Sequence, residues 1–279
     1  MSRIATVATL LAALVLGMAA GPGSAAAATS IQTSTSSAAS APIESPPSLD
    51  LFIASGFRYQ DPNMYACTST SAMDMLNFIA LAGVGGSGFH WAPSLSSAAR
   101  DQILTWERTH DTLAGGNGSD PHGIRNALNY YGWGAGTLRS GYRIYDDVSF
   151  WTYDGAVKRA VRAMAQTHKP VAILAWAGRH IQMMVGYYGL VGDPFAKDSL
   201  GRYTNAFTVE GFYLADPLKS QAFVNRPIAY SSLKYTTDMK FRYRAYLETD
   251  SPYDDPYTPG VVPARNEWYG RFVLVVPLR

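Results

Sequence analysis

The spacing of apolar residues predicts four helices in the first part of the chain. After Cys67, apolar residues recur every three or four positions until Gly83 stops the run, so a helix should begin at or beside Cys67. Asp120-Pro121 supplies the capping side chain and the proline that open a helix, and Gly132 closes that pattern. The other helices are expected at 98–109 and 154–167.

The period of the pattern changes at Val171, where short runs rich in β-branched and aromatic residues begin. We expect strands at 170–176, 181–188, 207–215, 228–235, 240–248 and 270–276. The basic and aromatic run at 240–246 alternates as a strand with one wet face does, and we favour that interpretation over a binding stripe. Helices followed by strands predict an α+β domain, in which N-terminal helices, including the one at Cys67, pack on an antiparallel β-sheet.

Residues 1–48 do not share this periodicity. Residues 1–28 carry one positive charge, at Arg3, then an apolar stretch and a run of alanines, which is the pattern of a secretory signal peptide. The stretch approaches the roughly 20 residues of a membrane anchor. Gly and Pro at 21–23 interrupt it, so we expect cleavage and a secreted, extracellular protein without stable membrane insertion. Residues 29–48, mostly Ser, Thr, Ala and Pro, are expected to form a disordered linker, and 49–279 one domain.

Charge and cysteine content narrow the classes of function. The formal net charge of +2 is too close to neutral to favour a nucleic-acid partner. The single cysteine, Cys67, cannot form an internal disulfide, so it is either a small buried hydrophobic residue or a nucleophile. There is no His-Glu-x-x-His motif, and the acidic pairs Asp146-Asp147 and Asp254-Asp255 lack the spacing of a calcium loop. We therefore expect neither a metal nor an organic cofactor.

The setting of Cys67 favours the nucleophile. At the change from loop to helix, its sulfur lies near the positive end of the helix dipole, which stabilises a thiolate. A thiolate attacks efficiently at neutral pH when an imidazole lies beside it. Among the five histidines we prefer His180, because it lies in the tight connection between the strands at 170–176 and 181–188 and can project over a cleft. The other four are His90, His110, His122 and His168.

Two further residues can complete such a site. Asp216 follows the strand at 207–215, and if that strand pairs with the one at 181–188, its carboxylate comes to lie beside His180 and orients the imidazole. The alternative is that Asp216-Pro217 only opens a turn, and position alone does not separate the two interpretations. Gln60, seven residues before Cys67, can supply a side-chain N–H to an oxyanion beside the backbone N–H of Cys67.

The order of these residues resembles that of the C39-like peptidase family in the papain-like superfamily. The resemblance rests on Gln60, the helix that begins at Cys67, and the segments Gly178-Arg179-His180 and Leu214-Ala215-Asp216-Pro217, and it covers most of 57–217. It implies a papain-like fold, with Gln60 at the oxyanion, Cys67 as nucleophile, His180 as general base and Asp216 as the orienting carboxylate. The chain is similar to a secreted bacterial member, and with no transporter region attached, we do not expect leader-peptide cleavage coupled to export.

The sequence therefore predicts a cysteine-type peptidase that hydrolyses peptide bonds through an acyl-enzyme. We expect a peptide or protein substrate and a monomer. Two alternatives stay open. An acyltransferase or transglutaminase-like enzyme uses the same Cys-His pair and passes the acyl group to an amine. A non-catalytic secreted module would instead use loop aromatics such as Trp91, Trp133 and Trp151 for binding.

Overall fold

The computed structural model describes residues 46–111, 118–218, 224–235, 268 and 270–279. Four of the sequence predictions lie outside the described residues: the signal peptide at 1–28, the linker up to residue 45, the strand at 240–248 and the acidic pair at 254–255. The described residues all belong to one unit, Ile43–Arg279.

The described part of the chain has an α+β fold with an antiparallel sheet, as the sequence predicts. The helices are α1 (Cys67–Leu81), α2 (Ser97–Glu107), α3 (Pro121–Trp133), α4 (Tyr153–Thr167) and α5 (Tyr230–Tyr235). The strands are β1 (Leu49–Asp50), β2 (Tyr145–Phe150), β3 (Val171–Ala175), β4 (His180–Tyr188), β5 (Gly211–Ala215), β6 (Arg226–Ala229) and β7 (Phe272–Pro277). The sheet order is β2-β7-β3-β4-β5-β6, and β1 adds to β4.

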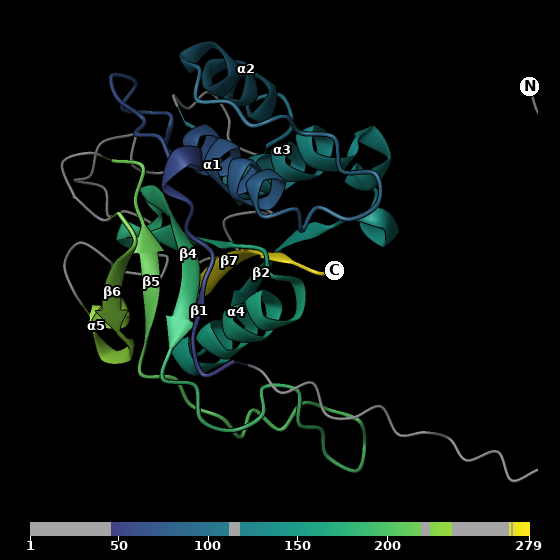
Figure 1. The fold of residues 1–279 in the computed structure, drawn as a ribbon, viewed down its shortest axis with the longest axis vertical. Coiled ribbons are helices and arrows are strands. Elements are labelled where there is room, and N and C mark those ends of the chain that lie inside the picture. The colour runs from purple at the N-terminus through teal and green to yellow at the C-terminus, as the bar shows by residue number, and fades with distance from the viewer. Residues whose placement is uncertain (1–45, 112–117, 219–223, 236–267, 269) are drawn as a thin grey trace, which may run out of the picture. The chain divides into compact units, whose positions relative to one another are not determined.

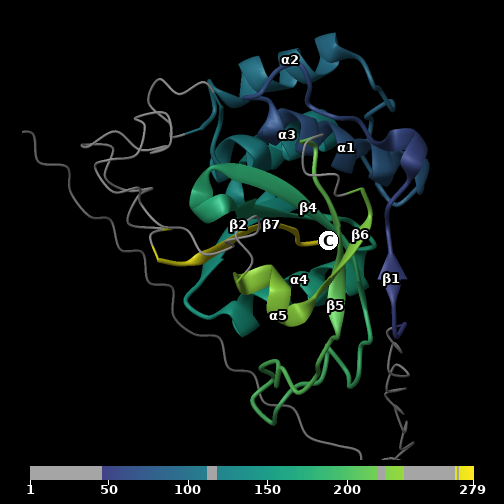
Figure 2. The same cartoon turned by 90° about the vertical axis from the view of Figure 1, so that its left-hand side faces the viewer.

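Helices cover both faces of this sheet. α1, α2 and α3 lie on one face and α4 and α5 on the other (Figure 1), and the view turned by 90° shows the sheet between the two layers (Figure 2). Along β3, Val171 and Ile173 pack into the core with α4, whereas Ala172 and Leu174 pack into the core with α1 and α3. Because both faces are buried, β3 is a continuous apolar run rather than an alternating one.

The central strand β4 changes faces part of the way along. Ile181, Met183 and Val185 pack with α1 and α3, but Tyr187 packs with α4, because the register of β4 against β5 shifts between Met184 and Gly186. Beyond this bulge, β1 pairs with β4, with Asp50 opposite Gly186. A Cβ atom at position 186 would collide with the backbone carbonyl of Leu49, so only glycine allows β1 to approach this closely.

The structure corrects two of the expected strands and adds one that was not expected. The strand expected at 228–235 is wrong beyond residue 229, where α5 begins at Tyr230 and buries Leu233 in the core with α4. The strand β2 was not expected in the helical half of the domain, although it pairs with β7 over all six of its residues. The strand expected at 207–215 begins only at Gly211.

Trp133 is also placed differently from the prediction. It is the last residue of α3 rather than a loop residue, whereas Trp91 and Trp151 do lie outside helices and strands. Among the helices of the described part of the chain, none combines the length and the apolar character that crossing a membrane requires.

Candidate active site

Cys67 is the first residue of α1, as the sequence predicts, and its side chain is half-buried. The N-cap residue of this helix is Ala66, which makes no side-chain cap hydrogen bond. By contrast, α2, α3 and α4 are capped by the side chains of Ser96, Asp120 and Thr152. The first-turn N–H groups of α1 therefore have no capping oxygen, and the positive end of the helix faces the sulfur.

His180 is the first residue of β4 and pairs with Ala175, the last residue of β3. The chain between them is a single 3-10 turn, Trp176–Gly178, in which Trp176 (φ 53°) and Gly178 (φ 110°) have left-handed backbone conformations. This tight turn places the indole ring of Trp176 on the imidazole of His180, with ring centroids 4.5 Å apart. One face of His180 is thereby covered.

Asp216 comes to His180 through the pairing of β4 with β5. Ala215, the last residue of β5, lies opposite Met183, so the next residue lies beside the start of β4. His180 Nε2 is 2.7 Å from Asp216 Oδ1. The other carboxylate oxygen, Oδ2, accepts a hydrogen bond of 2.6 Å from Gln182 Nε2. Asp216 is fully buried, and these bonds fix the orientation of its carboxylate.

Cys67, His180 and Asp216 thus form one continuous chain of interactions. Since Nε2 of His180 is used by Asp216, Nδ1 is the nitrogen left for the hydrogen bond that His180 makes with the Cys67 thiol. The backbone N–H of Ile181 also favours the thiolate form of Cys67 and lowers its pKa. The structure brings together these three residues, which lie far apart in the sequence.

The electrostatics favour an ion pair between Cys67 and His180. Burial alone would raise the pKa of Cys67, but the hydrogen bond and the charge of His180, together with the Ile181 N–H, outweigh it and lower that pKa. Burial opposes the charge on His180 too, but the hydrogen bonds to Asp216 and Cys67 raise the pKa of His180 to about 9. Each group therefore favours the charged form of the other, as in a thiolate–imidazolium pair.

Gln60 is buried and its backbone is fixed beside Asp216. Its N–H donates to Pro217 O at 2.8 Å, and its carbonyl accepts from Arg100 Nη1 at 2.6 Å. The side-chain Nε2 donates to Met64 O at 2.9 Å, which engages one of its two hydrogens. Within the described part of the chain, Gln60 Oε1 has no hydrogen-bond partner. The second Nε2 hydrogen makes no hydrogen bond with Met64 O, which accepts only one of the two.

Sequence reasoning missed a buried acid next to the nucleophile. Glu107, the last residue of α2, accepts a hydrogen bond of 2.6 Å from Thr68 Oγ1, one residue after Cys67. Burial raises the pKa of Glu107 well above its usual range, and the nearby charge of Cys67 raises it further. No sequence signal distinguishes Glu107 from a surface glutamate on α2. Gln182 was more accessible to prediction, because a side chain two residues after His180 on one strand shares its face.

The remaining histidines have other surroundings. His110 stacks on Trp106 with ring centroids 3.6 Å apart, and His122 Nε2 lies 3.4 Å from Asp147 Oδ2. His168 caps the C-terminus of α4 in a left-handed conformation (φ 53°), and His90 is exposed. No group of His, Cys, Asp and Glu among the described residues is arranged to hold a metal ion.

Comparison with known proteins adds no relative to this picture. No protein-family model, no curated protein and no solved structure matches the chain.

Proposed function

We propose that this protein is a cysteine-type peptidase of the papain-like kind, which hydrolyses peptide bonds with Cys67 as nucleophile. The observation that carries the proposal is the placement of His180 between the Cys67 sulfur and the Asp216 carboxylate. A structural cysteine would need neither an imidazole on its sulfur nor a buried carboxylate behind that imidazole. The lowered pKa of Cys67 also argues for a nucleophile rather than for an inert member of a binding module.

The arrangement of elements supports the papain-like assignment and the likeness to C39-like peptidases. In the described fold a helix begins at the nucleophile and packs on an antiparallel sheet, the base opens one strand and the carboxylate follows the next strand. The chain order, Cys67 then His180 then Asp216, is the order that the sequence resemblance requires.

The proposed reaction has two halves. Cys67 Sγ attacks the substrate carbonyl carbon and forms a C–S bond, while Gln60 Nε2 and the Cys67 N–H hold the oxyanion. His180 then passes its proton to the leaving amine as the C–N bond breaks. In the second half, His180 takes a proton from water and the hydroxide attacks the thioester carbonyl. The C–S bond then breaks, and the carboxylic acid leaves, with the Cys67 thiolate restored beside the protonated His180.

Export is the second part of the proposal. It is supported by the signal-peptide pattern at 1–28 and by the linker composition of 29–48. Expression in a secreting bacterial host should release protein that begins at Ala28 or Thr29, as N-terminal sequencing will show. Intact Met1 in the cell fraction would contradict it.

The first experiment needs no substrate. The rate at which iodoacetamide alkylates the protein is followed by intact mass against pH, in the wild type and in His180→Ala, and the single cysteine makes the assignment unambiguous. We expect fast alkylation well below the ~8.5 of an ordinary thiol, and its loss in His180→Ala. An ordinary thiol profile in the wild type would make Cys67 structural and would sink the proposal.

A second experiment tests the chemistry. Digestion of a peptide library should yield free carboxylate products, and Cys67→Ser should remove nearly all of this activity, since the base is tuned to a thiol. Addition of a primary amine distinguishes hydrolysis from acyl transfer. Products that form only with the amine present would replace the peptidase by an acyltransferase.

A further inference from the structure

A cavity lies at the opposite end of α1 from Cys67. It has a volume of about 890 Å³ and is lined by the glycine-rich loop 85–88, which follows α1, and by Trp133 and Ile144 among others. We call it the Trp133 pocket. α1 has 15 residues, and at a rise of about 1.5 Å per residue its two ends lie roughly 20 Å apart, so this pocket is separate from the proposed catalytic site.

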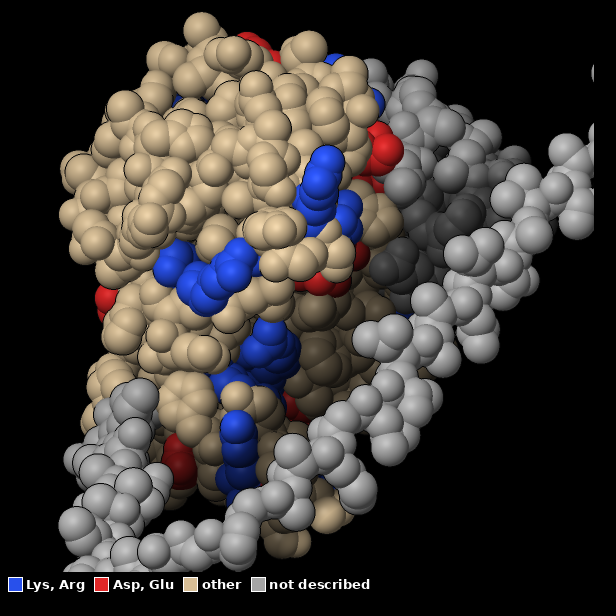
Figure 3. All heavy atoms as spheres, turned by 90° about the vertical axis from the view of Figure 1, so that its right-hand side faces the viewer, with Lys and Arg blue, Asp and Glu red and all other residues tan. Residues whose placement is uncertain are grey.

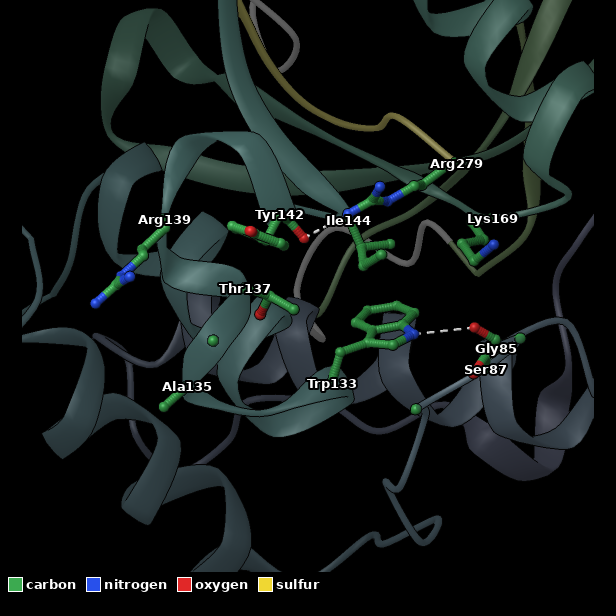
Figure 4. Close-up of a pocket in the computed structure, with 13 residues that line it drawn as sticks. Gly85, Ser87, Trp133, Ala135, Thr137, Arg139, Tyr142, Ile144, Lys169 and Arg279 are labelled. Carbon is green, nitrogen blue, oxygen red and sulfur yellow. Dashed lines mark hydrogen bonds between the residues drawn. The ribbon is translucent and has the colours of Figure 1, made fainter.

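The charged side chains that line the Trp133 pocket are all cationic: Arg139, Lys169 and Arg279. In Figure 4, Arg139 and Lys169 lie at opposite ends of the lining, with Arg279 and the ring of Trp133 between them. No Asp or Glu is among the lining residues within the described part of the chain. On the side of the molecule that Figure 3 faces, where the C-terminal strand ends in Figure 1, Lys and Arg side chains gather along the middle of the surface.

Lys169 is the informative member of this set. The residue is only 6% exposed. Its ammonium group has a single hydrogen-bond partner among the described residues, the carbonyl of Thr167, at the limiting distance of 3.5 Å. Burial lowers the pKa of its ammonium, as expected for a cation without a carboxylate beside it. A buried charge is costly unless it is paired. An anion in the pocket would supply the missing partner.

The two arginines that line the pocket can also contact a bound anion. Arg279 uses one guanidinium nitrogen, donating from Nη2 to Tyr142 O at 2.7 Å, as Figure 4 shows. Arg139 lines the same pocket, and its side chain is exposed. A guanidinium presents paired donors that suit the two oxygens of a carboxylate or a phosphate.

The wall between the cations is aromatic and rigid. Trp133 Nε1 donates to Gly85 O at 3.0 Å, which fixes the indole against the glycine-rich loop. Ile144 lies beside the ring (Figure 4). An indole face favours a planar or apolar partner, so the pocket combines a stacking surface with an anion-binding rim.

We propose that the Trp133 pocket binds a small organic anion, with its phosphate or carboxylate at Lys169 and Arg279, which lie at the same end of the lining (Figure 4), and its planar part on Trp133. The pocket is of the size that encloses a small ligand. The proposal does not depend on the reaction at Cys67. It gives Trp133, which the sequence suggested only as a possible stacking residue, a binding role.

Calorimetric titration of the protein with phenyl phosphate and with benzoate tests this inference. Benzyl alcohol, which keeps the ring and has no charge, is the neutral control. We expect at least one of the anions to bind and benzyl alcohol not to bind. Lys169→Met, which keeps the length and loses the charge, should weaken anion binding by about tenfold or more. Arg202→Gln, which removes a cation from an exposed loop pair with Asp198, should leave binding unchanged.

A fold defect in Lys169→Met is distinguished by a second variant. Arg279→Gln changes an exposed side chain and should also weaken binding, while the rate of Cys67 alkylation stays that of the wild type in both variants. Failure of both anions to bind the wild type would overturn the inference. Anion affinity equal to that of the wild type in both Lys169→Met and Arg279→Gln would overturn it as well. Binding of polyphosphate without binding of either small anion would overturn it too, because the occupant would then be a polyanion.

Discussion

His180 and Asp216 are 36 positions apart in the sequence, yet Nε2 of one lies 2.7 Å from Oδ1 of the other. The contact exists because β4 and β5 are neighbouring antiparallel strands, with the histidine at the start of the first and the aspartate just after the end of the second. Both side chains are buried, so the charge of the carboxylate acts on the imidazole with little screening by solvent.

Replacing Asp216 by Asn should lower the pKa of His180. The amide oxygen can still accept from Nε2–H, but the negative charge that favours the imidazolium is gone, so the midpoint should fall below the wild-type value of about 9 by about one unit or more. Titration of histidine-labelled protein by NMR measures this midpoint directly. Asp147→Asn, beside His122, is the matched control and should leave His180 unchanged. An unchanged midpoint in Asp216→Asn would contradict the assignment.

Removing the indole of Trp176 should expose the His180–Asp216 hydrogen bond to water. The ring centroids of Trp176 and His180 are 4.5 Å apart, and without the indole the bond would be weakened by solvent competition. We expect the Nε2–H resonance of His180 to broaden by exchange in Trp176→Ala and the alkylation of Cys67 at neutral pH to slow. Trp176→Phe keeps a ring at the same left-handed position and should behave like the wild type. Equal exchange rates of the His180 Nε2–H in Trp176→Ala and Trp176→Phe would show that Trp176 does not shield this hydrogen bond from water.

Glu107→Gln should stabilise the protein, and increasingly so as pH rises above 4.5. Burial raises the folded-state pKa of Glu107 above its ordinary value of 4.5, so in this window the folded state holds a proton that the unfolded state has released. Stability contributed at this position is therefore lost as pH rises, and glutamine, which still accepts from Thr68, has no such dependence. Thermal unfolding from pH 4.5 to pH 8 measures the widening difference. Glu210→Gln, at an exposed position, is the control, and a constant difference for Glu107→Gln would contradict the prediction.

Gly186→Ala should destabilise the fold by separating β1 from β4. The new Cβ atom would collide with Leu49 O, and relief requires a shift of backbone, which typically costs about 1–3 kcal/mol. Urea unfolding gives the change in the free energy of unfolding. Gly136→Ala adds the same methyl group where nothing lies within 4 Å and should be close to neutral. Equal free energies of unfolding in the two variants would show that β1 moves away from position 186 without loss of stability.

The sequence predicts the helices well because their signals are local. The stop at Gly83 and the opening at Asp120-Pro121 depend on neighbours within one or two turns, and α1 and α3 begin as expected. The strand at 228–235 was wrong because Leu233 is buried equally well in either conformation, and only the neighbouring α4 core decides between them. β2 was missed because its partner β7 lies more than a hundred residues further along the chain.

The candidate site shows the same division. Cys67 and His180 can be chosen from local context, and Asp216 follows once the pairing of two strands is assumed. Glu107 cannot be found in this way, because its contact with Thr68 depends on how α2 packs against α1, and packing angles between helices leave no mark on the sequence of either. The cluster of cations around Trp133 cannot be predicted from the sequence either, because its members come from three distant segments of the chain.

The uncapped start of α1 has a consequence for how this protein can be engineered. A serine or aspartate at an N-cap typically stabilises a helix by about 1 kcal/mol, but Ala66 is fully buried and lacks the extended backbone of the N-cap residues of α2, α3 and α4, so the cap would also require local repacking. The same oxygen would take the amide hydrogens that face the sulfur and would lie beside a thiolate that repels it. Selection for stability and selection for turnover therefore oppose each other at position 66. A thermostable variant with a cap there should have a less reactive Cys67 thiol.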